Sequence, residues 1–345
     1  MRVAVVNDVP MAVEAMRRVI RGTREHHVAW IAHDGAQAVA LCARDRPDLL
    51  LMDLMMPVMD GVEATRRIMA RTPCPIVVVT ANVDDHSSKV FEALGAGALD
   101  AVNTPILDHP ESPLGAQALL AKVATIEALL HGRPRSRTPH GAKLGRARPA
   151  SVRGKLVALG ASAGGPAALA AVLSTLPREF AAAILVVQHL DAHFVEGFSG
   201  WLQSQCRIPV RLAEQGDRPE SGVAFIAGRD QHLLLGESGR LGYSRIPEEA
   251  SYRPSVDQLL SSVSRHWTGE AAGVLLTGMG RDGAIGLLEM RRRGWLTVAQ
   301  NEATSAVYGM PKAAVEIQAA SEILPLEKIA PRLLEWVAQT AQLHV

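Results

Sequence analysis

Short apolar runs alternate with amphipathic segments along this chain, and the alternation predicts two α/β domains, each a doubly wound parallel sheet. It occurs twice in the 345 residues and is interrupted once, by a basic and Pro-rich stretch near the middle. Hydrophobic residues make up 48% of the chain, which is enough to fill two cores. Parallel sheets are favoured because helical segments separate successive strands, as βαβ crossovers require.

The first domain is predicted over residues 1–130. Helical patterns such as AVEAMRRVI, GAQAVALCARD and GVEATRRIMA lie between its apolar runs. The runs that predict strands are 3–6, 27–32, 48–53, 76–81 and 98–102. Five β-α units of this kind predict one parallel sheet with helices on both faces.

Residues 131–153 are rich in Arg, Lys, Pro, Gly and Ser and contain almost nothing to bury. This composition predicts a solvated, flexible linker. Its positive charge would also suit an acidic partner, but a tether is the commoner use of such a segment.

The second domain is predicted over residues 154–345, where the β-α alternation returns. Its strand candidates are 155–161, 181–189, 222–228, 232–237, 240–245, 271–278 and 295–300. The segment LLLGESGRLGYS has turn residues centred on glycine, which predict an antiparallel hairpin attached to the sheet.

Composition excludes several classes of protein. The chain has 36 basic and 35 acidic residues, so nothing in its charge predicts binding to nucleic acid or membrane lipid. Cys42, Cys74 and Cys206 form no C-x-x-C pair and lie far apart, which favours reduced thiols. The N-terminal apolar run of four residues is too short for a signal-peptide core, and no apolar run approaches the length of a membrane-spanning helix. We therefore expect a cytoplasmic protein with no direct membrane insertion.

Three polar residues follow strands of the first domain: Asp8, Asp53 and Thr80. The carboxyl ends of parallel strands meet at one edge of the sheet. Carboxylates that converge there repel each other, and a hard cation such as Mg²⁺ relieves the repulsion. Asp8 alone would also suit a helix N-cap just before Pro10, but Asp53 lies inside a hydrophobic stretch without an immediate helix.

The segment LLLMDLMMPVMDGVEATRRI, together with the strand-end Thr80, resembles the receiver domain of two-component response regulators over roughly residues 1–125. The resemblance implies a flavodoxin-like fold and a CheA-type histidine kinase as phosphodonor. Asp53 would be the phosphoacceptor and Thr80 the switch hydroxyl. Mg²⁺ would be held by Asp8, Asp53 and the main-chain carbonyl of Met55.

Three residues depart from the receiver pattern. Asn7 replaces one member of the acidic pair after the first strand, which leaves one direct carboxylate ligand there. Thr104 occupies the position of a lysine that would contact the phosphoryl group, and Ala101 occupies the position of an aromatic switch residue. These departures predict that phosphorylation is coupled only weakly to conformational change.

Ser162, His189 and Asp282 each follow an apolar strand of the second domain, which places them at one sheet edge. A serine needs a neighbouring base to become a nucleophile, and a histidine needs a carboxylate to fix its tautomer. Each residue alone also has a structural explanation, as a turn residue, a strand terminus and an N-cap. Together they predict a catalytic serine, base and orienting carboxylate.

The turn around the serine discriminates among enzyme classes. GASAG fits the G-x-S-x-G elbow of α/β-hydrolases, but those enzymes place Asp before His. The sequence has neither the G-x-G spacing of a dinucleotide site nor the G-K-[ST] of a phosphate loop. A helix opens after the turn, and we expect the N–H groups of Ala163 and Met279 to stabilise an oxyanion.

Residues 155–340 resemble the catalytic domain of CheB-type protein-glutamate methylesterases. The motifs are GASAGGPAAL, VVQH, YRPSVDQLL, TGMGRDGAIG and AQNEATSAVYGMP. The resemblance implies a Rossmann-like fold and assigns the catalytic roles to Ser162, His189 and Asp282. It also implies demethylation and deamidation of a methyl-accepting chemoreceptor, with no cofactor for the esterase reaction.

Within this family, the segments VVNDVPMAVEAMRR and GALDAVNTP are most similar to the Wsp-type branch of surface-sensing pathways, which control cyclic-di-GMP. Two other functions compete with the methylesterase hypothesis. One is a phosphorylation-dependent adaptor that only binds a partner, which an intact Ser, His and Asp argue against. The other is a lipid or small-ester hydrolase, for which the 4% aromatic content offers little apolar pocket.

Overall fold

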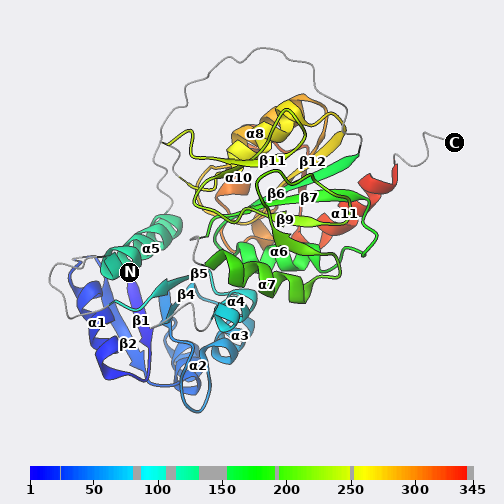
Figure 1. Cartoon of the computed structure of the whole chain (residues 1–345). Coiled ribbons are helices and arrows are strands. Elements are labelled where there is room, and N and C mark those ends of the chain that lie inside the picture. Colours follow the sequence, from blue (N-terminus) through cyan, green and yellow to red (C-terminus); the bar gives the residue numbers. More distant parts are fainter. Residues whose placement is uncertain are drawn as a thin grey trace. The chain divides into compact units, whose positions relative to one another are not determined.

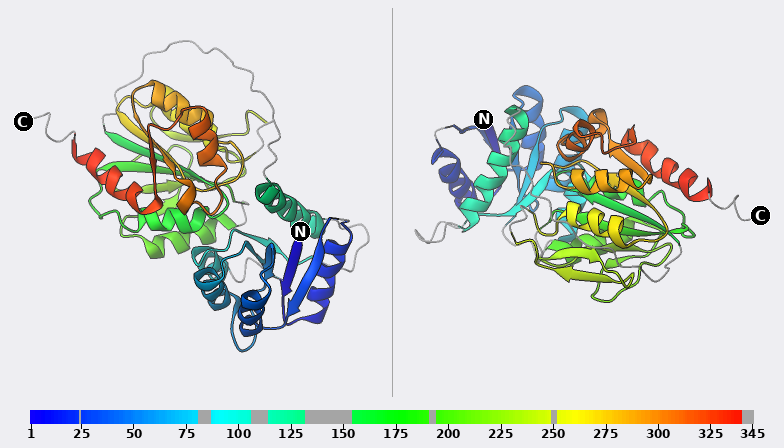
Figure 2. Two further views of the ribbon diagram at one scale, coloured as in Figure 1. Left: turned by 180° about the vertical axis from the view of Figure 1, so that it is seen from behind. Right: turned by 90° about the horizontal axis from the view of Figure 1, so that it is seen from above.

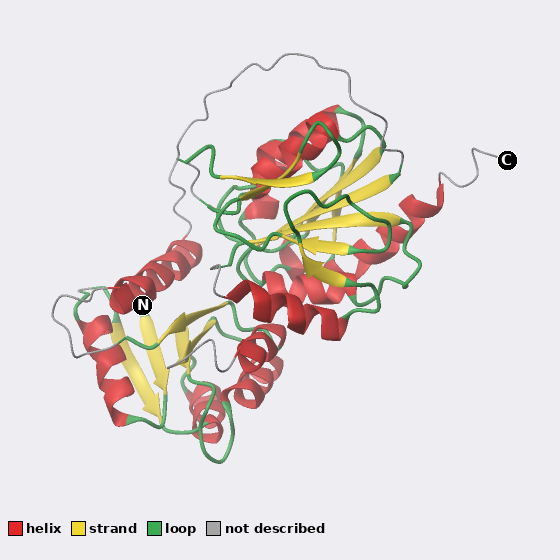
Figure 3. Cartoon of the chain, in the orientation of Figure 1, coloured by secondary structure: helices red, strands yellow, loops and turns green. Residues whose placement is uncertain are grey.

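The structure is a computed structural model that describes residues 1–23, 25–80, 87–105, 114–131, 154–190, 194–248 and 252–339. The chain divides into two compact units, Met1–Arg133 and Pro134–Val345, which are described separately. Figure 1 follows the chain through the elements of both units, and Figure 3 distinguishes helices from strands. The predicted linker lies outside the described residues from residue 132 onward.

The first unit is a five-stranded parallel sheet in the order β2-β1-β3-β4-β5. Helix α1 contacts α5, and α3 contacts both α2 and α4, so the two groups cover opposite faces (Figure 1). All five predicted runs contribute strands, which confirms the doubly wound fold. The elements are β1 (Arg2–Val6), α1 (Pro10–Arg21), β2 (His27–Ala32), α2 (Gly35–Arg44), β3 (Leu49–Met52), α3 (Gly61–Arg71), β4 (Ile76–Thr80), α4 (Ser87–Gly95), β5 (Asp100–Asn103) and α5 (Leu114–His131).

The core of the first unit is built on its central strands. Strands β3 and β4 read LLLM and IVVVT and are buried at every position, because helices cover both faces of a parallel sheet. Cys42 and Cys74, distant in the sequence, are buried neighbours whose thiols share a hydrogen bond. All three cysteines are free thiols.

The second unit is a seven-stranded, all-parallel sheet in the order β14-β13-β12-β6-β7-β9-β8. Helices α6, α7 and α11 lie on one face, and α8, α9 and α10 on the other (Figure 2). The strands are β6 (Lys155–Ala161), β7 (Ala182–Gln188), β8 (Val210–Leu212), β9 (Ala224–Ile226), β12 (Glu270–Leu275), β13 (Leu296–Gln300) and β14 (Glu322–Leu324). The helices are α6 (Gly165–Leu173), α7 (Val195–Gln205), α8 (Val256–His266), α9 (Ala284–Arg292), α10 (Met310–Glu316) and α11 (Leu326–Gln339), with a short 3-10 turn at Glu302–Thr304.

The structure differs from the prediction in two places. Strands β8 and β14 have no counterpart among the predicted strands, because these three-residue edge strands are partly exposed and carry no apolar run. The hairpin of β10 (His232–Leu235) and β11 (Leu241–Ser244) forms a separate two-stranded sheet and shares no strand pairing with the large sheet. It packs on α8 through the common hydrophobic core.

Three strands of the second unit end at one level. Strand β6 pairs with β7 on one side and with β12 on the other, so the chain reverses its direction of winding at β6. Ala161 lies opposite Gln188, and Gly160 lies opposite Leu275. Residues that follow these strands therefore meet at the carboxyl edge, where open α/β sheets bind ligands. Among the described helices of either unit, none is long and apolar enough to cross a membrane.

Candidate active site and phosphoacceptor site

Ser162 lies at the carboxyl end of β6, against the loop that follows β12. Its N–H donates a hydrogen bond to the carbonyl oxygen of Thr277 over 3.1 Å. Gly278 leaves room for the serine, because a Cβ built at Gly278 would lie 2.8 Å from the Cβ of Ser162. Gly164 then adopts a φ of 73° to begin α6, a conformation that favours glycine. The turn therefore presents a half-buried serine directly before a helix.

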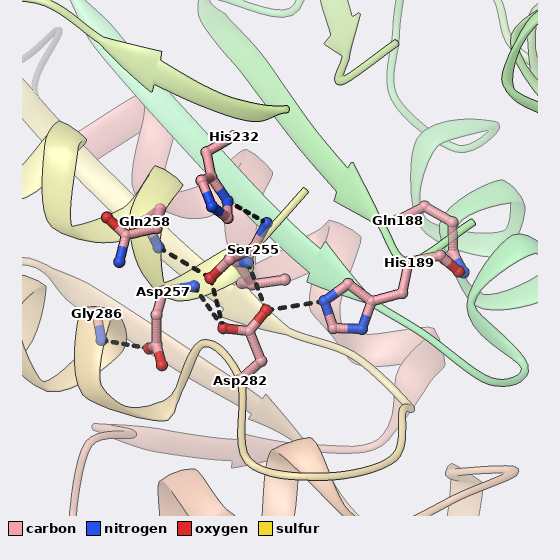
Figure 4. A network of polar contacts seen from close by, with 9 residues as sticks. Gln188, His189, His232, Ser255, Asp257, Gln258, Asp282 and Gly286 are labelled. Atoms are coloured by element: carbon pink, nitrogen blue, oxygen red, sulfur yellow. Dashed lines mark hydrogen bonds and ion pairs between the residues drawn. The ribbon is translucent and has the colours of Figure 1, made fainter. Parts of the chain in front are cut away.

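His189 and Asp282 form a buried pair at the same edge. The Nε2 atom of His189 lies 2.8 Å from Oδ2 of Asp282, and the two side chains are 8% and 9% exposed (Figure 4). A carboxylate can only accept, so Nε2 carries the proton and Nδ1 is the basic nitrogen. In the described part of the chain, the buried Nδ1 atom has no hydrogen-bond partner. Asp282 therefore fixes His189 at Nε2, and the lone pair of Nδ1 has no described partner.

Asp282 also holds the amino end of α8. Its carboxylate accepts hydrogen bonds from the hydroxyl of Ser255 (2.8 Å), the N–H of Val256 (2.6 Å) and the N–H of Asp257 (3.0 Å) (Figure 4). Burial opposes its ionisation, but the hydrogen bonds from His189 and from these N–H groups keep the pKa of Asp282 below its usual value. Asp282 is thus a fixed anion, and the N-cap position of α9 is taken by Gly283 instead.

Asp257 makes the reciprocal contact from the first turn of α8. Its Oδ1 atom accepts a hydrogen bond from the N–H of Gly286 in the first turn of α9 over 2.8 Å (Figure 4). Burial and the charge of Asp282 raise the pKa of Asp257 to about 7. Asp282, two residues before α9, therefore contacts the start of α8, and Asp257, in the first turn of α8, contacts the start of α9. These hydrogen bonds connect the amino ends of the two helices.

An aromatic ring covers the histidine. The rings of Tyr252 and His189 are stacked, with centroids 4.2 Å apart and planes 6° from parallel. Burial and the nearby charge of Asp282 raise the pKa of Tyr252, so it is a neutral phenol. The stack restricts rotation of the imidazole.

The candidate nucleophile Ser162 and the loop that carries Met279 lie close together, since a Cβ at Gly278 would come within 2.8 Å of the Cβ of Ser162. Among the described residues, no hydrogen bond joins Oγ of Ser162 to His189, and the N–H groups of Ala163 and Met279 donate to no protein acceptor. Catalytic hydrogen bonds of this kind often tighten only when substrate binds. The hydroxyl and both N–H groups are therefore available to a ligand.

Other histidines of the second unit, such as His232 and His193, are further candidates for a base. His232 is fully buried and accepts the N–H of Ser255 at Nδ1, while its Nε2–H donates to the carbonyl of Pro247. His193 lies outside the described residues. Ser255 and Asp257 have no role in the site that the sequence predicts. The S-x-x-Q spacing of SVDQ could have identified Ser255 as an N-cap, and its side chain does accept the N–H of Gln258 (Figure 4).

In the first unit, Asp53 follows β3 and is 8% exposed. Its carboxylate accepts hydrogen bonds from the side-chain amide of Asn7 (3.0 Å) and from the N–H of Leu54 (2.7 Å). Asn7 therefore supplies a donor where a second carboxylate would repel Asp53. Thr80 is buried at the end of β4, and the N–H of Thr104 donates to its carbonyl over 3.0 Å.

The donor set of this pocket fits Mg²⁺. Mg²⁺ in proteins takes one or two carboxylates and keeps several waters, and Asp8, Asp53 and the carbonyl of Met55 match that demand. Asp8 is half-buried and is not the helix cap, because Val9 occupies the N-cap position of α1. In the described ranges, no group of three or more His, Cys, Asp or Glu side chains has metal-binding geometry.

A receiver-type unit with an aspartate pocket, joined to an α/β unit with a His–Asp pair at its strand ends, defines a response regulator whose output domain is an enzyme. Residues 157–333 match the family model of the CheB methylesterase, and residues 3–110 match that of the response regulator receiver domain. The chain belongs to the CheB methylesterase family, and it is a carboxylic ester hydrolase with a receiver domain.

Similar proteins cover the whole chain. It is 54% identical, over 97% of its length and 98% of the relative, to "Protein-glutamate methylesterase/protein-glutamine glutaminase 2" of Cupriavidus metallidurans. It is 55% identical, over 96% of both chains, to "Protein-glutamate methylesterase/protein-glutamine glutaminase 1" of Bordetella avium. The crystal structure of the Thermotoga maritima CheB methylesterase catalytic domain matches with a TM-score of 0.52 and 34% identity, over 54% of this chain and 100% of that one.

Asp257 predicts a pH-dependent stability difference. Its pKa is about 7 in the folded chain and about 4 in the unfolded chain, so its contribution to stability is largest below pH 4 and is lost as the pH rises to 7. The asparagine of the Asp257→Asn variant cannot ionise, so the variant does not lose this stability as the pH rises. When the pH is raised from 5 to 8, the unfolding free energy of wild type should therefore fall, relative to that of the variant, by on the order of 2 kcal/mol.

Calorimetric melting of both proteins at the two pH values measures this difference. Asp217→Asn is the control, because Arg211 keeps the pKa of Asp217 below its usual value and no change is expected between pH 5 and pH 8. A constant difference between Asp257→Asn and wild type over this range would show that Asp257 does not titrate there.

Proposed function

We propose that this protein is a protein-glutamate methylesterase that hydrolyses methylated glutamate side chains on a methyl-accepting chemoreceptor, and that it also deamidates receptor glutamine. The observation that carries the proposal is the histidine with one fixed and one free nitrogen: Nε2 of His189 is bound to Asp282, and the buried Nδ1 has no described partner. Relatives that share more than half of the sequence are named as enzymes of this activity.

Acyl transfer through Ser162 follows from this arrangement. Oγ of Ser162 attacks the side-chain ester carbonyl, and Nδ1 of His189 takes the hydroxyl proton. The N–H groups of Ala163 and Met279 stabilise the oxyanion, while Asp282 stabilises the imidazolium. The proton then passes to the leaving methoxide, which departs as methanol and leaves an acyl-enzyme.

Deacylation repeats the chemistry with water. Nδ1 of His189 takes a proton from water, the hydroxide attacks the acyl carbonyl, and the proton returns to Oγ of Ser162 as glutamate is released. With a glutamine substrate, the same steps release ammonia in place of methanol. Neither route needs a metal or an organic cofactor.

The receiver domain regulates this reaction through Asp53. A CheA-type histidine kinase is the proposed phosphodonor, and Asp53 is the acceptor. Asp8, Asp53 and the carbonyl of Met55 would hold the Mg²⁺ ion, which neutralises the charge of the transferring phosphoryl group. Thr80 is the switch hydroxyl, and Thr104 supplies a neutral hydroxyl where a lysine would supply a charged donor.

We place the enzyme in the cytoplasm, as the soluble output of a receptor pathway. The segments VVNDVPMAVEAMRR and GALDAVNTP favour a Wsp-type surface-sensing pathway over chemotaxis. Receptors of the same organism, methylated with labelled methyl groups, would identify the substrate by release of labelled methanol.

Ser162→Ala tests the proposed nucleophile. The turn tolerates alanine, so the variant should fold with an unchanged melting temperature while methanol release falls by about 10³-fold or more. Loss of Ser162, His189 and Asp282 together should cost about as much as loss of Ser162 alone, because the three act as a unit.

Ser174→Ala, at the other end of α6, is the matched control and should keep wild-type turnover. Wild type should also be labelled by a fluorophosphonate probe, and Ser162→Ala should not. Turnover above one-tenth of wild type in Ser162→Ala would refute the assignment and favour another nucleophile or an adaptor.

Thr104→Lys tests the weakened switch. A charge-assisted hydrogen bond to a phosphoryl oxygen is about twice as strong as a neutral one, and a ligand shifts an equilibrium only by its differential affinity. At saturating Mg²⁺, beryllofluoride should therefore raise esterase activity by a larger factor in Thr104→Lys than in wild type. Asp53→Asn should abolish the response in both backgrounds. An equal or larger factor in wild type would show that Thr104 does not weaken the switch.

A further inference from the structure

Gln188, the last residue of β7, lies between the two residues that carry the proposed reaction. Its side chain is buried, and its Nε2 atom donates hydrogen bonds to the carbonyl oxygens of Ser162 (2.8 Å) and His189 (3.1 Å). One amide group therefore joins the main chains that carry the proposed nucleophile and the proposed base. Figure 4 shows its place beside His189.

The acceptor end of the same amide has no such partner. Within the described residues, the buried Oε1 atom of Gln188 receives no hydrogen bond. It lies against Gly165, the first residue of α6, where a Cβ would approach it to 1.9 Å. The amino end of a helix favours the partial negative charge of this oxygen. An orphaned buried acceptor is otherwise unfavourable, so packing alone does not explain a glutamine here.

The contact to Ser162 sets the direction of a peptide plane. The carbonyl of Ser162 accepts from Nε2 of Gln188 and also from the N–H of Gly165 over 2.7 Å. In a trans peptide the C=O and the following N–H point in opposite directions. The N–H of that peptide belongs to Ala163, so fixing the carbonyl on one side aims this N–H to the other side, away from Gln188.

We propose that Gln188 is a positioning residue for the esterase reaction, which fixes the Ser162–Ala163 peptide as an oxyanion donor and ties it to the main chain of His189. This inference rests on the proposed function, because it assigns no separate activity. The oxyanion exists only in the transition state, so loss of the amide should lower kcat and leave KM unchanged.

The test compares Gln188→Met and Gln188→Glu with wild type. Methionine keeps the length of the side chain but has no donor, and an ionised glutamate keeps the shape but only accepts. Both variants should lose at least about tenfold in kcat for methanol release, with KM within about twofold. The saturating rate of fluorophosphonate labelling should fall in parallel, while the half-saturating probe concentration stays constant.

Gln203→Met is the matched control. Gln203 also braces main-chain groups, since it accepts the N–H of Val210 and donates to the carbonyls of Cys206 and Ile208. It lies in the last turn of α7, beside the start of β8 and at the amino edge of the sheet, and Gln203→Met should keep kcat within about twofold of wild type. Melting temperatures of all variants separate loss of folded protein from loss of rate.

Gly165→Ala tests the role of the Gln188 amide without replacing the glutamine. Its new Cβ would displace Oε1 of Gln188, so kcat should fall as in Gln188→Met, provided that the protein melts as a folded chain. In the double variant Gly165→Ala, Gln188→Ala, the amide that the Cβ displaces is already absent. The double variant should therefore lose no more kcat than Gln188→Ala alone.

The outcomes separate this inference from the proposed function. Wild-type kcat in folded Gln188→Met, or fully additive losses in the double variant, would overturn the role of Gln188 while Ser162→Ala remains inactive. Labelling or turnover of Ser162→Ala would instead overturn the proposed function itself. A rise in KM with constant kcat would also contradict the inference, because it would show that Gln188 contributes to ground-state binding.

Discussion

The carboxylate of Asp282 is the contact on which the catalytic edge depends. It accepts one hydrogen bond from the ring of His189 and three from the start of α8, so a single anion joins the end of β7, the loop after β12 and a helix. The helix N–H groups keep the carboxylate ionised in a buried position. The histidine therefore has a fixed Nε2 proton and a free Nδ1, which is the state that a general base requires.

The surroundings of Asp53, the candidate phosphoacceptor, contain neutral side chains where a receiver pattern has charged ones. Asn7 donates an amide hydrogen to Asp53, where an acidic residue would add repulsion and a further cation ligand. Thr104 is tied by its N–H to the carbonyl of Thr80, and its side chain offers only a neutral hydroxyl. If Asp53 is the phosphoacceptor, these residues leave it in place and offer less electrostatic stabilisation to a phosphorylated state.

Features that depend on residues close together in the sequence could be predicted, whereas features that depend on contacts between distant residues could not. Both sheets and the positions of Ser162, His189 and Asp282 could be predicted, because long apolar runs mark the central strands and polar residues follow them directly. Strands β8 and β14 lack that signal. The contacts of Asp257 and Gln188 and the contact of Ser255 with Asp282 could not be predicted, because each joins groups that only the fold brings close together.

The tautomer of His189 tests the central claim most directly. Nitrogen-15 NMR of histidine-labelled protein, with His189→Gln to assign the resonances, distinguishes a protonated ring nitrogen from an unprotonated one. At a pH where the imidazole is neutral, we expect a protonated Nε2 and an unprotonated Nδ1, and we expect Asp282→Asn to disturb this preference. A dominant Nδ1–H tautomer in wild type would contradict the account, because Nδ1 would then carry a proton and could not accept one.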